Sequence, residues 1–150
     1  MLTHKYKPNL EQIPQNIKPL VEYVTNYSKQ KKKALLLHGP PGTGKTAAIY
    51  ALAEKLDLEL VEVNASDFRS ADEINAKIGN AIKQQSLFAR SKLILIDEID
   101  GIAGNEDRGG VSALAELITN SKFPIIMIAN LPYEQKLNPL RTKSLMVEFP

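Results

Sequence analysis

The stretch GPPGTGKT, residues 39–46, follows the apolar run ALLLH at 34–38 and precedes a segment with helical periodicity. Its spacing is G-x-x-x-x-G-K-[ST], in which the glycines let successive backbone amides turn inward on phosphate groups. The loop needs a strand before it and a helix after it, because the positive end of the helix dipole attracts the same phosphates. A glycine-proline turn that only joins a strand to a helix is the alternative, and this context disfavours it. The stretch therefore predicts a nucleotide-binding loop.

Two side chains at the end of this loop are predicted to act on a bound nucleotide. Lys45 is expected to neutralise the β and γ phosphates, and the Thr46 hydroxyl to occupy one position in the coordination shell of a magnesium ion. The other residues expected to contact the nucleotide are Gly39, Pro40, Pro41, Gly42, Thr43, Gly44 and Ala47. ATP and Mg²⁺ are accordingly the expected ligands.

Apolar runs alternate along the chain with segments of helical period, which is typical of a parallel sheet covered by helices on both faces. Several runs are apolar on both faces of the strand, as buried parallel strands require. The predicted strands are at 34–38, 58–64, 93–97, 124–130 and 145–149. The fold class is therefore α/β, with a five-stranded parallel sheet.

Three helices are predicted between these strands. The first follows Lys45, the second begins after Ser70, and the third includes 111–118, each with an apolar stripe at helical spacing. Ser70 and Glu73 form the S-x-x-E pattern of a capping box, which satisfies two unpaired amides at a helix start.

The segment before the first strand is expected to contain one more helix. It runs from about Ile17 to Lys29, with Pro19 in its first turn, where proline is tolerated. The lysine run KQKKK at 29–33 then leads into the strand. Charge runs are usually solvated, so this run is interpreted as a solvated turn.

Two adjacent carboxylates, Asp97 and Glu98, follow the apolar run LILI. At the carboxyl end of a buried parallel strand they should emerge beside the phosphate loop. Asp97 is expected to hold the magnesium ion through its water shell, and Glu98 to orient and deprotonate the water that attacks the γ phosphate. A calcium loop is excluded because the stretch lacks the D-x-[DN]-x-[DN]-G register. A structural acidic pair stays open, although burying unpaired charge is costly.

Asn130 closes the fourth predicted strand and should reach the same edge of the sheet as Lys45 and Glu98. There it could sense the γ phosphate or hold the attacking water. An asparagine after a strand is also a common turn former, which is the alternative interpretation.

Composition limits the function classes. The chain has 150 residues, 43% hydrophobic and 24% charged, as expected for one globular domain over 1–150. A net charge of +2 leaves any nucleic-acid contact to a local patch, and the absence of cysteine excludes disulfides and thiolate metal sites. The sequence has no apolar leader and no apolar run near the roughly 18 residues that span a bilayer. A soluble, cytoplasmic protein is expected.

Four stretches of the sequence can be compared with known families: KYKP at 5–8, GPPGTGKT at 39–46, NASDFRS at 64–70 and DEIDGIAGNEDRGG at 97–110. Together they resemble AAA+ ATPases of the clamp-loader branch, and within it the large subunit of replication factor C. The resemblance implies a P-loop sheet of strand order 5-1-4-3-2, an adenine-contacting segment at 1–33, and an α/β sandwich at 34–150 without the helical lid or collar. It further implies an intracellular ATPase at the replication fork, in a hetero-oligomer with small clamp-loader subunits that opens the sliding clamp and loads it on primer-template DNA.

The resemblance also implies roles for residues in the first and third stretches. Tyr6 and Pro8 would line the adenine pocket, with Lys7 where arginine is usual. Asn64 would hold Glu98 in an idle orientation until DNA binds. It is the candidate switch residue.

Basic residues after the second and third strands would face a DNA channel in such a protein. Arg69, Lys77 and Arg108 are the candidates for phosphate contacts, and ordinary surface charges are the equal alternative. Lys143 stands where small clamp-loader subunits carry the arginine that reaches a neighbour's ATP site. It lacks the planar fork of arginine, so this chain is expected to receive such a finger without donating one.

The sequence thus predicts a DNA-stimulated ATPase core that is weak or inactive alone, because an arginine finger contributes on the order of a thousandfold or more in related phosphoryl transfer. Two alternatives stay open. One is a nucleotide-binding switch module without turnover of its own. The other is a different AAA+ DNA machine, such as a junction helicase motor or a replication initiator.

Overall fold

The computed structural model describes residues 17–68, 70–83, 91–102 and 108–150. Tyr6, Pro8 and Arg69 lie outside these residues, as does the side chain of Arg108. Within the described ranges, no helix combines the length and apolar character needed to span a membrane.

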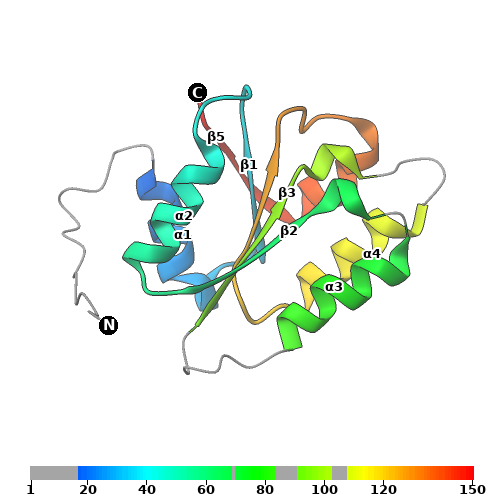
Figure 1. Cartoon of the computed structure of the whole chain (residues 1–150), viewed down its shortest axis with the longest axis horizontal. Coiled ribbons are helices and arrows are strands. Elements are labelled where there is room, and N and C mark those ends of the chain that lie inside the picture. The colour runs from blue at the N-terminus through cyan, green and yellow to red at the C-terminus, as the bar shows by residue number, and fades with distance from the viewer. Residues whose placement is uncertain (1–16, 69, 84–90, 103–107) are drawn as a thin grey trace.

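A single five-stranded parallel sheet forms the centre of the fold (Figure 1). Its strands are β1 (Ala34–His38), β2 (Glu59–Asn64), β3 (Lys92–Asp97), β4 (Ile125–Ala129) and β5 (Ser144–Glu148). They are arranged in the order β2-β3-β4-β1-β5, which confirms the predicted order 5-1-4-3-2. Because β1 pairs in register with both β4 and β5, the carboxyl ends of the strands meet at one edge. The predicted strands are correct, with bounds that differ by no more than one residue.

Helices cover both faces of the sheet, as predicted. The helices α1 (Lys18–Thr25) and α2 (Lys45–Lys55) lie on one side, and α3 (Ala71–Lys83) and α4 (Arg108–Thr119) on the other (Figure 1). Alternate residues of β1 face the two layers, so Leu35 and Leu37 are buried with α1 and α2, whereas Leu36 is buried with α3 and α4. This two-sided burial explains why the strands are continuous apolar runs.

The capping prediction for α3 is confirmed in part. The Ser70 Oγ accepts a hydrogen bond from the Glu73 amide at 3.2 Å, which satisfies one of the unpaired amides at the start of the helix. The Ser70 hydroxyl also lies 3.5 Å from the Glu73 carboxylate.

The predicted N-terminal helix is too long at its carboxyl end. α1 ends at Thr25, and a separate 3-10 turn follows at Tyr27–Lys29. Asn26 separates the two with φ −106° and ψ 27°, and its Nδ2 donates to the Glu22 carbonyl at 3.1 Å. The Asn26 backbone amide donates to the same carbonyl at 3.1 Å, so the side chain adds a second donor at the residue where the backbone leaves the helix.

Between β4 and β5 the structure contains two elements that the sequence did not predict. A 3-10 turn at Gln135–Leu137 leads into the short helix α5 (Asn138–Thr142). Leu137 and Leu140 anchor this segment in the core on the side of α3 and α4. Five residues are too few to show a helical period, so the segment carried no clear pattern.

Candidate nucleotide-binding site

The loop between β1 and α2 requires glycine at its first position because another backbone lies against it. A Cβ atom at Gly39 would lie 2.1 Å from the carbonyl oxygen of Phe149. The Phe149 amide in turn donates to the His38 carbonyl at 2.6 Å. The end of β5 therefore fixes the start of the loop, and Gly39 serves this packing.

Gly44 has a different task, at the point where the loop becomes α2. It is the N-cap of that helix and has φ +84°, in the left-handed region that favours glycine. Since glycine has no side chain to cap the helix, the first amides of α2 stay available to an anion. The start of α2 thus has the form that phosphate binding needs.

The Lys45 side chain is folded into the loop and is only 6% exposed. Its Nζ donates to the carbonyls of Gly39 at 2.9 Å and Pro40 at 2.6 Å, and to the Thr43 hydroxyl at 3.2 Å. Burial lowers the pKa of Lys45, and the nearby negative charge of Asp97 partly offsets this effect. Phosphate oxygens could replace the loop carbonyls as partners of this ammonium group.

Thr46 and Asp97, the two predicted magnesium ligands, lie together. The Thr46 hydroxyl is 3.3 Å from Asp97 Oδ2, while Asp97 Oδ1 accepts from the Glu98 amide at 2.8 Å. A hydroxyl and a carboxylate are the hard oxygen donors that Mg²⁺ prefers. Among the described residues no three acidic, histidine or cysteine side chains form a metal cluster. The donor set therefore fits an ion that phosphates and water also coordinate, as Mg²⁺ usually is with nucleotides.

Glu98 has an exposed side chain and a strained backbone. Its φ of 54° and ψ of 49° place a non-glycine residue in the left-handed region, directly after the buried strand β3. Such strain is sparse in proteins and gathers at functional sites. The turn thereby presents the carboxylate at the edge of the sheet, where general-base chemistry would be required.

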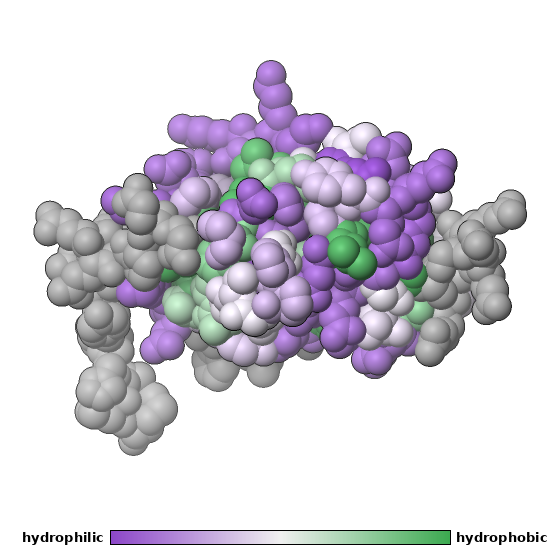
Figure 2. Space-filling view, turned by 90° about the horizontal axis from the view of Figure 1, so that it is seen from above, coloured by the Kyte–Doolittle hydropathy of each residue, from purple (hydrophilic) through white to green (hydrophobic). Residues whose placement is uncertain are grey.

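A hollow of about 320 Å³ brings the central predicted residues together at the carboxyl edge of the sheet. This edge is at the top of Figure 1, and Figure 2 shows a mostly hydrophilic surface on that side. Asn130, exposed at the end of β4, lies on the wall of the hollow. The predicted residues that line it are Pro41, Gly42, Gly44, Lys45, Thr46, Ala47, Asp97, Glu98 and Asn130.

Asn64 ends β2 and pairs in register with Asp97. Its Oδ1 accepts from the Ser66 amide at 2.9 Å and from the Ser66 hydroxyl at 2.6 Å, which caps the 3-10 turn at Ala65–Asp67. This turn packs closely on the one that follows Glu98, since a Cβ at Gly101 would lie 2.8 Å from Ser66 Cβ. The turn that Asn64 caps is therefore in close contact with the turn after Glu98. The switching role of Asn64 stays a prediction.

The predicted basic side chains that the structure describes, those of Lys77 and Lys143, do not line the hollow. Lys77 is exposed on α3. Lys143 precedes β5 and is thus at the opposite, amino edge of the sheet, where its Nζ donates to the Thr119 hydroxyl at 2.7 Å. The lysine run 29–33 reaches the same edge and is exposed at Lys31 and Lys32, in keeping with a solvated turn.

Two residues that the sequence reasoning missed connect the loops of the site. The Asp100 carboxylate accepts from the Leu131 amide, and the Lys136 ammonium group donates to the Asp100 and Ile102 carbonyls. Asp100 belongs to the same acidic stretch as Glu98, which was a usable signal. Lys136 belongs to no pattern in the sequence, so its position is visible only in the fold.

The parallel sheet, the loop before α2 and the acidic pair after β3 together define a P-loop ATPase. Residues 35–148 match the model of the ATPase family associated with various cellular activities (AAA), and the chain belongs to this family.

Its relatives include replication factor C large subunits, which confirms the resemblance seen in the motifs. The chain is 52% identical to that of Nanoarchaeum equitans over 97% of its own length and 35% of the relative. It is 46% identical to that of Staphylothermus marinus, over 88% of the chain and 32% of the relative. It is 42% identical to that of Aeropyrum pernix, over 97% of the chain and 32% of the relative. The chain spans about a third of the length of these curated relatives.

Proposed function

We propose that the chain is the ATP-binding and ATP-hydrolysing core of the large subunit of a sliding-clamp loader. The observation that carries this proposal is the hollow in which Lys45, Thr46, Asp97 and Glu98 converge, in a chain similar to replication factor C large subunits. The AAA family is a family of ATPases, and the similarity to replication factor C large subunits supports the finer role in clamp loading.

The residues of the hollow divide the work of ATP hydrolysis. Lys45 exchanges its bonds to the loop carbonyls for bonds to the β and γ phosphates, to which its charge is better matched. Thr46 and Asp97 would hold a magnesium ion, which would supply positive charge against the charge that develops on the phosphates. Glu98 accepts a proton from the attacking water, and Asn130 orients that water or the γ phosphate.

The switching role of Asn64 depends on the turn that it caps. In the described conformation its carbonyl oxygen holds Ser66, so its amide group remains the part that could bind Glu98. Movement of the Ala65–Asp67 turn would then move this amide toward Glu98 or away from it. DNA bound near Arg69 and Lys77 could supply such a movement, because both follow this turn in the sequence.

The remaining parts of the proposal concern partners. Tyr6 and Pro8, in the segment 1–33, contact adenine. Arg69, Lys77 and Arg108 contact the phosphates of primer-template DNA. A small clamp-loader subunit supplies an arginine finger to the ATP site of this chain, whereas Lys143 does not supply one to a neighbour's site. The complex works inside the cell at the replication fork.

The first test compares ATP hydrolysis by the chain alone with hydrolysis after small clamp-loader subunits are added. The mixture is measured with and without sliding clamp and primed DNA. Stimulation that disappears in Glu98→Gln supports a working site in a shared loader. If the chain binds ATP and is not stimulated, the nucleotide-binding switch is correct instead. Stimulation by a branched junction in place of clamp and primed DNA would favour a junction helicase motor.

Two substitutions separate binding from hydrolysis. Lys45→Ala should abolish measurable ATP binding, because loss of one partner in a buried charge pair costs about 2–5 kcal/mol. Glu98→Gln should keep ATP binding and lose hydrolysis by about 10²- to 10⁴-fold, the usual contribution of a general base. Calorimetric titration and single-turnover hydrolysis measure the two quantities. Glu54→Gln, on the exposed side of α2, is the matched control and should change neither. Equal loss of binding in Lys45→Ala and Glu98→Gln would contradict the separate roles.

A further inference from the structure

Two charged side chains outside the hollow connect the loops that carry Glu98 and Asn130. Asp100 lies in the 3-10 turn Ile99–Gly101, directly after Glu98. Lys136 lies in the 3-10 turn Gln135–Leu137, a few residues after Asn130. Neither Asp100 nor Lys136 lines the hollow, although the charge of Asp100 also partly offsets the lowering of the Lys45 pKa by burial. An effect of Lys136 on hydrolysis must therefore pass through the loops.

Lys136 reaches from the second loop to the first. Its Nζ donates to the Asp100 carbonyl at 2.8 Å and to the Ile102 carbonyl at 2.7 Å. These carbonyls belong to the end of the turn after Glu98, where a helix-like segment leaves acceptors without partners of its own. The Lys136 side chain is 27% exposed and lies 3.9 Å from the Glu134 carboxylate. One ammonium group thus holds two successive parts of the Glu98 turn.

Asp100 makes the reverse connection. Its Oδ2 accepts from the amide of Leu131 at 3.1 Å, and Leu131 directly follows Asn130. Each loop therefore sends one charged side chain to the backbone of the other. Hydrogen bonds that include an ionised group are stronger than neutral ones, and these three restrain backbone positions on both sides.

The hydrogen bonds between the two loops can stabilise the strained backbone of Glu98. A residue in the left-handed region keeps that conformation only when its surroundings over-determine it. Within the turn, the Gly101 amide donates to the Glu98 carbonyl at 2.9 Å. The bonds from Lys136 hold the far end of the same turn.

We propose that Asp100 and Lys136 are positioning residues that fix Glu98 relative to Asn130 for ATP hydrolysis, an inference that rests on the proposed function. Glu98 and Asn130 must meet the same water and γ phosphate, and a misplacement of about 1 Å can cost about a hundredfold in rate. The hydrogen bonds of Asp100 and Lys136 to the opposite loops set the distance between Glu98 and Asn130, because they fix the backbone of both loops.

The test is single-turnover ATP hydrolysis by the chain assembled with small clamp-loader subunits, sliding clamp and primed DNA, with the complex in excess over labelled ATP, together with the dissociation constant for ATP. Lys136→Met keeps the length of the side chain and removes the charge, and it should lower the rate about 10- to 100-fold with ATP affinity unchanged. Lys136→Arg should restore most of the rate, because arginine can donate to both carbonyls. Lys122→Met, exposed at the opposite edge of the sheet, is the matched control and should hydrolyse ATP at the parent rate.

A double substitution distinguishes positioning from general stability. In a Glu98→Gln background, Lys136→Met should cause no further loss, because the residue through which it acts is already changed. A further loss of the same size, or a loss of ATP affinity, overturns the positioning role. If Lys136→Met does not fold, Lys136→Gln is measured in the same cycle, with the same criteria.

The same measurements separate this inference from the proposed function. A Glu98→Gln variant that hydrolyses ATP at the parent rate overturns the proposed function. A Glu98→Gln variant that is inactive, beside a Lys136→Met variant with the parent rate, overturns only the positioning role.

Discussion

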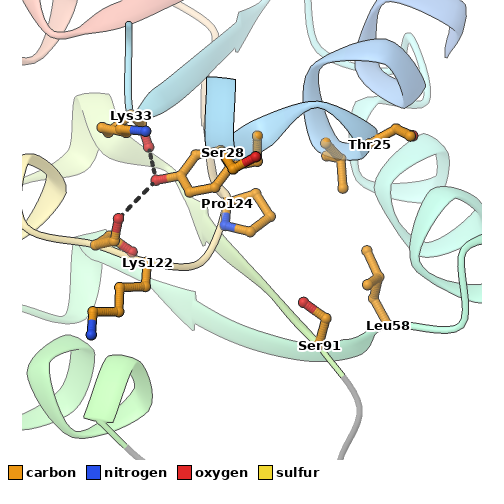
Figure 3. Close-up of a pocket in the computed structure, with 10 residues that line it drawn as sticks. Thr25, Ser28, Lys33, Leu58, Ser91, Lys122 and Pro124 are labelled. Carbon is orange, nitrogen blue, oxygen red and sulfur yellow. Dashed lines mark hydrogen bonds between the residues drawn. The ribbon is translucent and has the colours of Figure 1, made fainter. Parts of the chain in front are cut away.

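The two edges of the sheet use buried polar groups in opposite ways. At the carboxyl edge, Lys45 binds loop carbonyls that phosphates can replace, and Glu98 is held in a strained conformation. At the amino edge, Tyr23 donates to the Lys32 carbonyl at 2.7 Å and Tyr27 to the Lys33 carbonyl at 2.8 Å. The Tyr27 hydroxyl also lies 3.2 Å from the Ser121 carbonyl, and Figure 3 marks both of its bonds. At the carboxyl edge the hydrogen-bond partners of Lys45 can be exchanged for a ligand. At the amino edge the tyrosine hydroxyls bind backbone carbonyls and stabilise the position of the chain.

Burial has opposite consequences for the two kinds of group. It raises the pKa of Tyr27 to about 12, so that hydroxyl stays protonated and remains a donor at every ordinary pH. It lowers the pKa of Lys45, so burial works against the charge that Lys45 needs. A phosphate would favour that charge. Burial in the folded chain therefore favours the neutral form in which Tyr27 acts as a donor at the amino edge. At the carboxyl edge, burial opposes the charged form of Lys45, which a bound phosphate would stabilise.

The largest expected effect tests whether backbone packing against the end of β5, and not ligand binding, determines the residue at position 39 of the carboxyl edge. Gly39→Ala should destabilise the protein by more than about 4 kcal/mol, because the new Cβ would lie 2.1 Å from the Phe149 carbonyl oxygen. Gly42→Ala is the matched control. It meets no atom within 4 Å and has only its φ of +80° to oppose it, so it should cost about 1–2 kcal/mol. Urea unfolding measures both, and equal losses would mean that the end of β5 does not constrain Gly39.

The regular part of this fold could be predicted because its signals are local and repeated. The strand at 34–38 has the predicted bounds, because the apolar run is limited by the lysine run before it and by the glycine and prolines after it. The loop before α2 was predictable because its strand and helix context lies within the adjacent sequence. Asp97, Glu98 and Asn130 followed from one rule, that parallel strands bring their carboxyl ends to the same edge.

The irregular part could not be predicted because its partners are far apart in sequence. Lys136 binds carbonyls 36 and 34 residues before it, and no spacing rule anticipates such a pair. The early end of α1 depends on the backbone conformation of Asn26, with φ −106° and ψ 27°, which propensity alone does not decide. Asn64 was chosen by resemblance, and its bond to Ser66 came only from the structure.

The next effect tests the amino edge. Tyr27→Phe should destabilise the protein by about 1–3 kcal/mol, because the Lys33 and Ser121 carbonyls lose their shared donor. ATP affinity should not change, since Tyr27 is at the edge opposite the hollow. Tyr50→Phe is the control, because Tyr50 is 45% exposed and its bond to Glu62 lies at the surface, where the loss should be below about 0.5 kcal/mol. A change in ATP affinity for Tyr27→Phe would show that the two edges are coupled.

The smallest effect depends on pH and returns to the carboxyl edge. His38 is buried at the end of β1, with the Tyr133 ring 5.8 Å away. Burial lowers the pKa of His38, the charge of Glu148 opposes this, and the charge of Lys45 adds to it. The unfolded chain therefore binds a proton at His38 more tightly than the folded one, and the stability should decrease as the pH falls through the ordinary histidine value of about 6.5.

Unfolding free energies at pH 7.5 and pH 5.5 measure this loss of stability on acidification. The loss should be smaller than the loss of stability caused by Tyr27→Phe. His38→Gln should flatten the pH dependence, and His4→Gln, which replaces the other histidine of the chain, should leave it in place. The opposite outcome for the two variants would refute the assignment to His38. Because His38 directly precedes the loop that holds Lys45, bound ATP should also reduce the acid loss: its phosphates offset the positive charge that opposes protonation.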